Sequence, residues 1–244
     1  MDKNKDITPE DYAKLIELYK ADVSIFSQQV FGFTLSEKQK EIADALQNNR
    51  LVTVRGAVSV GKTALMAIIA WHNLVCYPEV LCTLWGPNES NLRDGVIRAM
   101  RELHDKMAEP FKSLYECGRE NFSRKINPAS CYAQMRLASK ERPDSARGLH
   151  QVRNVVLCDE STEIDDSVLE ILMNVLSDPD PKILLISNPS KRSGFFYKTH
   201  TDEEISKHWV QIHTTIYDAP NYDPDRLAAQ VAQYGGATSN RYRS

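Results

Sequence analysis

One stretch of this chain sets its architecture: Arg55-Gly56-Ala57-Val58-Ser59-Val60-Gly61-Lys62-Thr63-Ala64. It matches the pattern G-x-x-x-x-G-K-T and lies between two apolar runs, residues 51–54 and residues 65–71. The order strand, glycine loop, helix distinguishes a phosphate-binding loop (P-loop) from a coincidental glycine turn. The sequence therefore predicts that this loop binds the phosphates of a nucleoside triphosphate.

The fixed positions of the loop each have a chemical reason. Gly56 and Gly61 let the backbone curl so that successive N–H groups point at phosphate oxygens. The following helix adds its positive N-terminal end, Lys62 reaches the β- and γ-phosphates, and the Thr63 hydroxyl binds Mg²⁺. We expect the nucleotide-binding set to be Gly56, Ala57, Val58, Ser59, Val60, Gly61, Lys62, Thr63 and Ala64.

A pair of acids, Asp159-Glu160, follows the apolar run of residues 155–158. One interpretation is a buried strand that meets solvent at two surface acids. The other is a magnesium-binding Asp159 beside a Glu160 that orients or deprotonates the attacking water. An adjacent acid pair at a buried strand end is costly unless it is compensated, which favours the second interpretation. The Asp-Glu order is typical of ATPases that do mechanical work, and the sequence lacks the N-K-x-D motif of GTPases.

Two further polar residues are candidates for nucleotide contacts. Asn188 follows the apolar run of residues 183–187, where it either senses the γ-phosphate or begins an Asn-Pro turn. Gln39 lies three residues after Ser36, a spacing that predicts a capping box at a helix start. Many nucleic-acid motor ATPases also carry a Gln before the P-loop strand that contacts adenine, so both roles remain open for Gln39.

The apolar pattern predicts an α/β fold. Continuous apolar strands are expected near 51–54, 80–85, 155–158 and 183–187, and alternating strands at 131–138 and 209–217; helices are expected at 8–30, 36–47, 88–107, 168–176 and 225–234. Such alternation predicts a mainly parallel sheet with helices on both faces, which together with the P-loop is the P-loop NTPase fold. We expect an N-terminal helical segment, residues 1–50, to pack on an ATPase core formed by residues 51–244. Because ligands bind beyond the carboxyl ends of parallel strands, residues 56–63, 159–160 and 187–188 should converge.

Composition excludes several other classes. The net charge is −3, the five cysteines contain no C-x-x-C pair, and the six histidines show no zinc-binding spacing. No apolar run approaches a membrane span and the N-terminus does not read as a signal peptide, so we expect a cytosolic protein with no membrane partner. Residues 119–153 carry a net charge of +5 and residues 154–190 carry −7, which suggests a basic face distinct from an acidic one.

The order of these motifs resembles the ATPase domain of a tailed-bacteriophage terminase large subunit. The resemblance rests on residues 56–63, 155–160 and 186–189, together with 145–150 and 194–197. It implies a RecA-like core of the additional-strand, catalytic-glutamate (ASCE) type that couples Mg²⁺-dependent ATP hydrolysis to translocation of double-stranded DNA into procapsids. It also implies a homo-oligomeric ring on the procapsid portal, a terminase small subunit as partner and action in the host cytoplasm.

The resemblance gives Arg147 a role as an arginine finger acting on a neighbouring subunit's γ-phosphate, with Lys62, Glu160 and Asn188 as the other catalytic residues. Binding to the DNA backbone, or a plain surface ion pair, is the alternative for Arg147. Two features depart from the family: residues 57–60 contain no arginine, and the sequence stops at residue 244, about where the family's linker to a nuclease domain would begin. We therefore expect ATPase activity without nuclease activity, from an excised domain or a naturally short relative. The competing functions are another RecA-like nucleic-acid-stimulated ATPase or helicase, and a non-hydrolysing, nucleotide-gated DNA-binding module.

Overall fold

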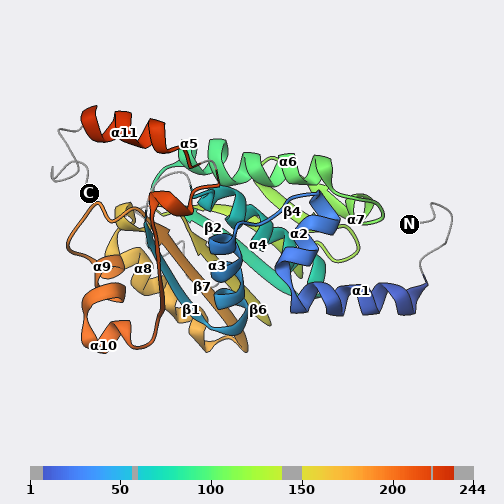
Figure 1. Ribbon diagram of the computed structural model, residues 1–244. Helices are drawn as coiled ribbons and strands as arrows, with labels where there is room; N and C mark the ends of the chain where they lie inside the picture. Colours follow the sequence, from blue (N-terminus) through green and yellow to red (C-terminus); the bar gives the residue numbers. More distant parts are fainter. Residues whose placement is uncertain (1–7, 57–59, 139–149, 221, 234–244) are drawn as a thin grey trace.

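The computed structural model describes residues 8–56, 60–138, 150–220 and 222–233, and a mixed sheet runs through this part of the chain (Figure 1). Its strand order is β3-β4-β5-β2-β6-β7-β1-β8. The neighbours from β5 to β8 pair in parallel, whereas β3, β4 and β5 pair antiparallel. The strands are β1 (Leu51–Gly56), β2 (Val80–Gly86), β3 (Tyr115–Cys117), β4 (Asn121–Arg124), β5 (Cys131–Leu137), β6 (Arg153–Cys158), β7 (Asp180–Ser187) and β8 (Val210–Thr214).

Helices cover both faces of this sheet, which confirms the predicted fold class (Figure 1). Alternate residues of β7 show the two faces: Leu184 and Ile186 belong to a core that includes α4, while Ile183 and Leu185 belong to a second core with α8 and α9. The helices are α1 (Pro9–Ala21), α2 (Val23–Phe31), α3 (Glu37–Asn48), α4 (Lys62–Cys76), α5 (Glu89–Leu92), α6 (Arg98–Lys106), α7 (Phe111–Leu114), α8 (Asp166–Leu172), α9 (Phe195–Thr201), α10 (Glu203–Ser206) and α11 (Pro224–Gln233).

The single helix predicted for residues 8–30 is wrong, because Asp22 divides it. Asp22 has an extended backbone (φ −145°, ψ 106°), and its carboxylate accepts hydrogen bonds from the N–H groups of Ser24 and Ile25. A short acidic side chain that bonds to nearby backbone N–H groups favours the start of a helix over its interior. Asp22 therefore ends α1 and begins α2.

Other elements match the expected positions with different lengths. Ser36 and Gln39 form the predicted capping box of α3, and Asn88 caps α5. The helix expected as far as Met107 contains a π-helical segment, Arg93–Ile97, between α5 and α6. The strand expected at 209–217 ends at Thr214, because Thr215 and Asp218 form a capping box that starts a 3₁₀ turn, Ile216–Asp218.

The N-terminal helices pack directly on the P-loop helix. Phe26 of α2 is fully buried and lies edge-on to the His72 ring of α4, with ring centroids 5.2 Å apart. His72 Nε2 lies 2.8 Å from the Tyr19 carbonyl oxygen of α1. Helices α1 to α3 and the sheet thus share one hydrophobic core, although the boundary at residue 50 stays a prediction. In the described residues, no helix combines the length and the apolar character needed to cross a bilayer.

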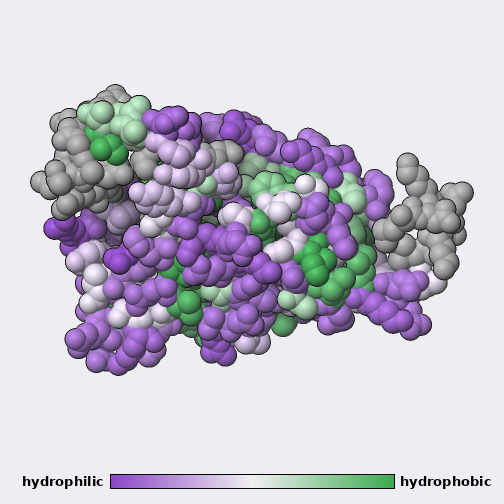
Figure 2. All heavy atoms as spheres, in the orientation of Figure 1, coloured by the Kyte–Doolittle hydropathy of each residue, from purple (hydrophilic) through white to green (hydrophobic). Residues whose placement is uncertain are grey.

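The basic face expected from residues 119–153 is wrong in part, because two of its arginines act inside the fold. Arg124 donates to the carbonyl oxygens of Leu74, Val75 and Tyr77 at the end of α4. Arg153 is buried, bonds to Asn73 and Asp180, and lies over the Tyr77 ring. Figure 2 shows hydrophilic residues over most of the viewed face, with small hydrophobic areas between them.

The buried His72 predicts a pH-dependent stability. The pKa of His72 is lowered to about 4, mainly by burial and to a smaller extent by the nearby Arg153. A histidine with a folded-state pKa below its ordinary value stabilises the fold fully above pH ~6.5 and loses this contribution as the pH falls towards 4. The unfolding free energy should fall between pH 7 and pH 4, and we expect this fall to be smaller in His72→Gln by up to about 3 kcal/mol.

Denaturant unfolding at several pH values measures this effect. The matched control is His208→Gln, since His208 is exposed and should leave the pH profile unchanged. Parallel pH profiles for His72→Gln and the unmodified chain would contradict the assignment.

Candidate nucleotide-binding site

The strand ends that the sequence predicted to converge do line one cavity. Its volume is about 460 Å³, and it lies at the carboxyl edge of the sheet, where β1, β6 and β7 end. The lining residues come from the P-loop, from the turn after β6 and from the turn after β7: Gly61, Lys62, Thr63, Asp159, Glu160, Glu163, Ser187, Asn188 and Ser190. Segments separated by about a hundred residues of sequence are therefore brought to one site.

The two P-loop glycines are required by geometry. Gly61 has φ 73°, in the left-handed region that other residues rarely adopt, and a Cβ there would lie 2.4 Å from Gln39 Nε2. A Cβ on Gly56 would lie 1.9 Å from Thr214 Oγ1. Gly61 also caps α4, so the N-terminal end of this helix faces the cavity with its first residues Lys62 and Thr63, whereas the predicted contact residue Ala64 does not line the cavity. The predicted loop residues Ala57, Val58 and Ser59 lie outside the described residues, and Val60 is buried.

Lys62 bridges the P-loop and the end of β7. Its Nζ donates to Asn188 Oδ1 at 2.5 Å and to the Gly56 carbonyl oxygen at 3.4 Å. Burial lowers the pKa of Lys62, and the carboxylates of Asp159 and Glu160 act in the opposite direction. The ammonium group is thus held at the centre of the cavity with acceptors on two sides.

Asp159 has the surroundings of a cation ligand. Burial raises its pKa, the main opposing influence is the hydrogen bond from the Glu160 N–H to Oδ1, and Lys62 is the nearby cation. In the described part of the chain, no group of three or more His, Cys, Asp or Glu could hold a metal ion. One carboxylate and the Thr63 hydroxyl fit Mg²⁺, which keeps several waters and takes its other ligands from phosphate oxygens.

Glu160 adopts an unusual backbone conformation. Its φ of 49° makes it the one non-glycine residue with positive φ in the described chain. Such conformations cost about 1–3 kcal/mol and concentrate at functional sites. The Glu160 Oε2 accepts a hydrogen bond of 2.8 Å from Asn91 Nδ2 of α5.

Asn91 was missed in the sequence analysis. It lies in α5, five residues after the buried strand β2 ends, whereas Asp159 and Asn188 directly follow β6 and β7. The amide that faces the Glu160 carboxylate thus comes from the segment after a fourth strand, in addition to β1, β6 and β7.

The turns after β6 and β7 are tied together by buried hydroxyl groups. Ser187 Oγ accepts a hydrogen bond from the Thr162 N–H and lies 2.6 Å from the Thr162 hydroxyl oxygen, and this hydroxyl also lies 2.9 Å from the Asn188 carbonyl oxygen, which accepts from it. Beyond them, Lys191 pairs with Glu163 at 2.8 Å. A shift of the Asn188 backbone must therefore disturb the turn that carries Glu160.

Gln39 contacts the P-loop as well as its own helix cap. Its Oε1 accepts from the Ser36 N–H, and its Nε2 lies 3.3 Å and 3.2 Å from the carbonyl oxygens of Val60 and Gly61. Its predicted adenine contact stays a prediction. Arg147 lies outside the described residues, so its role as an arginine finger also stays a prediction.

Comparison with known proteins identifies the family. Residues 54–243 match the family described as terminase large subunit, T4likevirus-type, N-terminal. The chain belongs to the terminase large subunit family. A "Probable terminase, large subunit" of Enterobacteria phage P7 is 22% identical to the chain, over 97% of the chain and 50% of the P7 protein.

Solved terminase structures share the fold. The large terminase of the thermophilic bacteriophage D6E superimposes with a TM-score of 0.66 at 15% identity, over 84% of this chain and 51% of the D6E chain. The large terminase ATPase domain of Thermus phage P74-26 has a TM-score of 0.63 at 18% identity, over 86% of this chain and 93% of that domain. The chain therefore spans about half the length of the P7 and D6E proteins and nearly all of the P74-26 ATPase domain.

The hydroxyl link between the two turns predicts a stability loss. In Ser187→Ala, the buried N–H of Thr162 loses its acceptor and the Thr162 hydroxyl loses one of its two partners, so we expect the unfolding free energy to fall by about 1–3 kcal/mol. Denaturant unfolding measures the change. The control is Ser190→Ala in the same loop, whose exposed hydroxyl contacts Glu163 and should matter by less than about 0.5 kcal/mol. Equal stability of the two variants would contradict the link.

Proposed function

We propose that this chain is the ATP-hydrolysing motor domain of a DNA-packaging terminase and moves double-stranded DNA into a procapsid. One observation carries this proposal: Lys62, Asp159, Glu160 and Asn188, from three strand ends, line one cavity at the start of α4. Membership of the terminase family supports it. The D6E terminase is described in complex with ADP and with ATP-γ-S, and the P74-26 domain is described as an ATPase domain.

The residues of the cavity divide the chemistry of hydrolysis among them. The N–H groups at the start of α4 and the Lys62 ammonium bind the phosphates and stabilise the charge that develops on the transferred γ-phosphoryl group. Thr63 and Asp159 would hold Mg²⁺, which supplies charge neutralisation between the β- and γ-phosphates. Glu160 accepts a proton from water as the water oxygen bonds to the γ-phosphorus and the bond to the leaving ADP oxygen breaks. Asn91 orients the Glu160 carboxylate, and ADP and inorganic phosphate are the products.

The contacts of Asn188 suggest how hydrolysis is transmitted. With ATP bound, Asn188 and Lys62 can both face the γ-phosphate, and loss of that phosphate removes their shared partner. Because the Asn188 carbonyl is bonded to Thr162, the change spreads to the turns after β6 and β7 and to the Lys191–Glu163 pair. We propose that this movement shifts the loop of residues 190–194 against DNA.

The wider assembly belongs to the same proposal. A ring of such subunits on the procapsid portal, in the host cytoplasm and with a small subunit as partner, would let Arg147 of one subunit act on the γ-phosphate of the next. Residues 51–244 form the motor core in this proposal, and residues 1–50 brace it.

The proposal predicts that Glu160→Gln binds ATP but does not turn it over. The variant keeps the size of the side chain and loses the proton acceptor, so phosphate release should fall by about 10²–10⁴-fold while the Kd for ATP changes less than about threefold. Glu170→Gln, on the exposed side of α8, is the matched control and should hydrolyse ATP normally. Phosphate release is measured with and without duplex DNA.

Three outcomes contradict this proposal. Unchanged hydrolysis by Glu160→Gln removes the role of Glu160. ATP binding without hydrolysis by the unmodified chain, with or without DNA, favours a nucleotide-gated binding module. Separation of DNA strands during hydrolysis favours a helicase.

Asn91→Ala tests the orientation of Glu160 separately. Loss of the Asn91 hydrogen bond leaves the Glu160 carboxylate free to rotate, so we expect kcat to fall about 10- to 100-fold with little change in KM for ATP. Ser90→Ala, on the same short helix, is the control and should keep both constants. A rise in kcat for Asn91→Ala would show instead that Asn91 restrains Glu160.

A further inference from the structure

The sheet order gives a bound triphosphate a direction. The groups assigned to the γ-phosphate end, Glu160 and Asn188, follow β6 and β7, which lie on one side of β1. The only strand on the other side of β1 is β8 in the described sheet. Because the nucleoside is attached at the opposite end of the triphosphate, it should extend from the P-loop towards the end of β8.

Two exposed aromatic side chains lie where this direction leads. Tyr217 follows β8 by three residues and is 65% exposed, and Tyr222 is 38% exposed. Their ring centroids are 5.2 Å apart with an angle of 58° between the planes, so Tyr222 supports one side of the Tyr217 ring. An exposed aromatic ring leaves a large apolar surface in water, and a ligand that stacks on the ring buries this surface.

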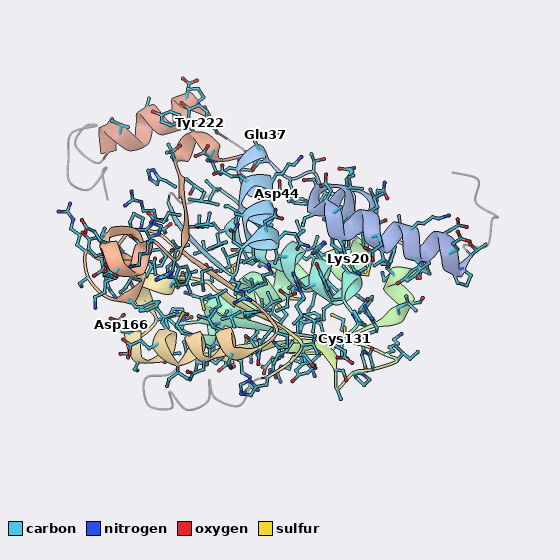
Figure 3. All side chains as sticks on the ribbon, turned by 90° about the horizontal axis from the view of Figure 1, so that it is seen from below. Lys20, Glu37, Asp44, Cys131, Asp166 and Tyr222 are labelled. Atoms are coloured by element: carbon cyan, nitrogen blue, oxygen red, sulfur yellow. The ribbon has the colours of Figure 1, made fainter. Side chains whose placement is uncertain are left out.

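The turn that carries Tyr217 is held in place. Asp218 accepts hydrogen bonds from the N–H and the hydroxyl of Thr215, and the N–H of Thr215 is the main influence that lowers the pKa of Asp218. Asp218 is also attracted to Lys38, next to Gln39 on α3. Figures 1 and 3 agree that the segment with Tyr222 lies beside the N-terminal end of α3, near Glu37. The ring of Tyr217 is therefore on a fixed turn next to α3, the helix whose Gln39 contacts the P-loop.

A buried hydroxyl group connects this turn to the P-loop. Thr214 is 1% exposed, and its Oγ1 finds no hydrogen-bond partner among the described residues. The same oxygen lies against Gly56, the first fixed position of the P-loop. Close packing of Thr214 on Gly56 thus fixes the end of β8 beside the first position of the P-loop.

We propose that Tyr217, supported by Tyr222, is the stacking platform for the nucleobase of the bound nucleotide, with Thr214 at the inner end of this nucleoside subsite. The proposal rests on the proposed ATP site and adds the binding of its base. Stacking on an aromatic ring tolerates any base, because every base has a π-face. The platform therefore raises affinity for nucleoside triphosphates in general and leaves base selection to other groups.

Equilibrium titration of three ligands in the presence of Mg²⁺ tests this subsite: ATP, GTP and inorganic tripolyphosphate, which has the phosphates without a nucleoside. For Tyr217→Ala we expect the Kd values for ATP and GTP to rise at least about fivefold and that for tripolyphosphate to stay unchanged. Tyr217→Phe should bind all three ligands as the unmodified chain does. Tyr222→Ala should show a smaller loss for ATP and GTP. Tyr197→Ala, on α9 at the opposite face of the sheet, is the matched control.

The results separate this proposal from the ATP site itself. Unchanged ATP and GTP affinity in Tyr217→Ala overturns the platform, as does an unmodified chain that binds tripolyphosphate as tightly as ATP. If Lys62→Ala binds tripolyphosphate as well as the unmodified chain, the P-loop assignment fails, and the subsite fails with it. Thermal unfolding of each variant checks that the fold is kept. Because Tyr217 is exposed, we expect its substitutions to leave the unfolding temperature unchanged.

Discussion

The structure depends on one ammonium group held between two strand ends. Lys62 is half-buried and reaches Asn188 beyond β7 and the carbonyl of Gly56 at the end of β1, with Asp159 and Glu160 close enough to influence its pKa. Bringing one cation and two carboxylates to the edge of a hydrophobic sheet is unfavourable unless they compensate one another. In the proposed function, a magnesium triphosphate would add both a cation for Asp159 and anions for Lys62. The charges of the site fit a ligand of this kind.

The rest of the fold holds these groups in place at the cavity. Parallel pairing of β6, β7 and β1 places their carboxyl ends at one edge, and the Ser187–Thr162 hydrogen bonds join two of the turns there. On the other side of the loop, α3 supplies Gln39, whose amide bonds to the carbonyls of Val60 and Gly61. Helices α1 and α2 pack on α4 through Phe26 and His72. A change at the cavity can thus reach both the turns after β6 and β7 and the N-terminal helices.

The sequence predicts the parts of the structure that local chemistry fixes. The P-loop pattern, the apolar strands and the capping box of Ser36 and Gln39 each have a short-range cause, and each is found at the expected place. The convergence of residues 56–63, 159–160 and 187–188 also follows, because parallel strands present their carboxyl ends together.

Tertiary contacts explain what the sequence does not predict. The break at Asp22 depends on a choice between two local hydrogen-bond patterns, and the internal roles of Arg124 and Arg153 depend on which carbonyls lie near them. A count of charges along the chain cannot distinguish an arginine that faces solvent from one that caps a helix end. Asn91 and Glu160 are 69 residues apart, and their contact depends on how α5 leaves β2.

The most direct test of the central claim is a crystal structure of the chain with Mg²⁺ and a non-hydrolysable ATP analogue. The account predicts a γ-phosphate between Lys62 and Asn188, a metal ion bound by the Thr63 hydroxyl and reached by Asp159 through water, and a water molecule between Glu160 and the phosphorus. A nucleotide bound elsewhere, or carboxylates of Asp159 and Glu160 turned away from its phosphates, would contradict it.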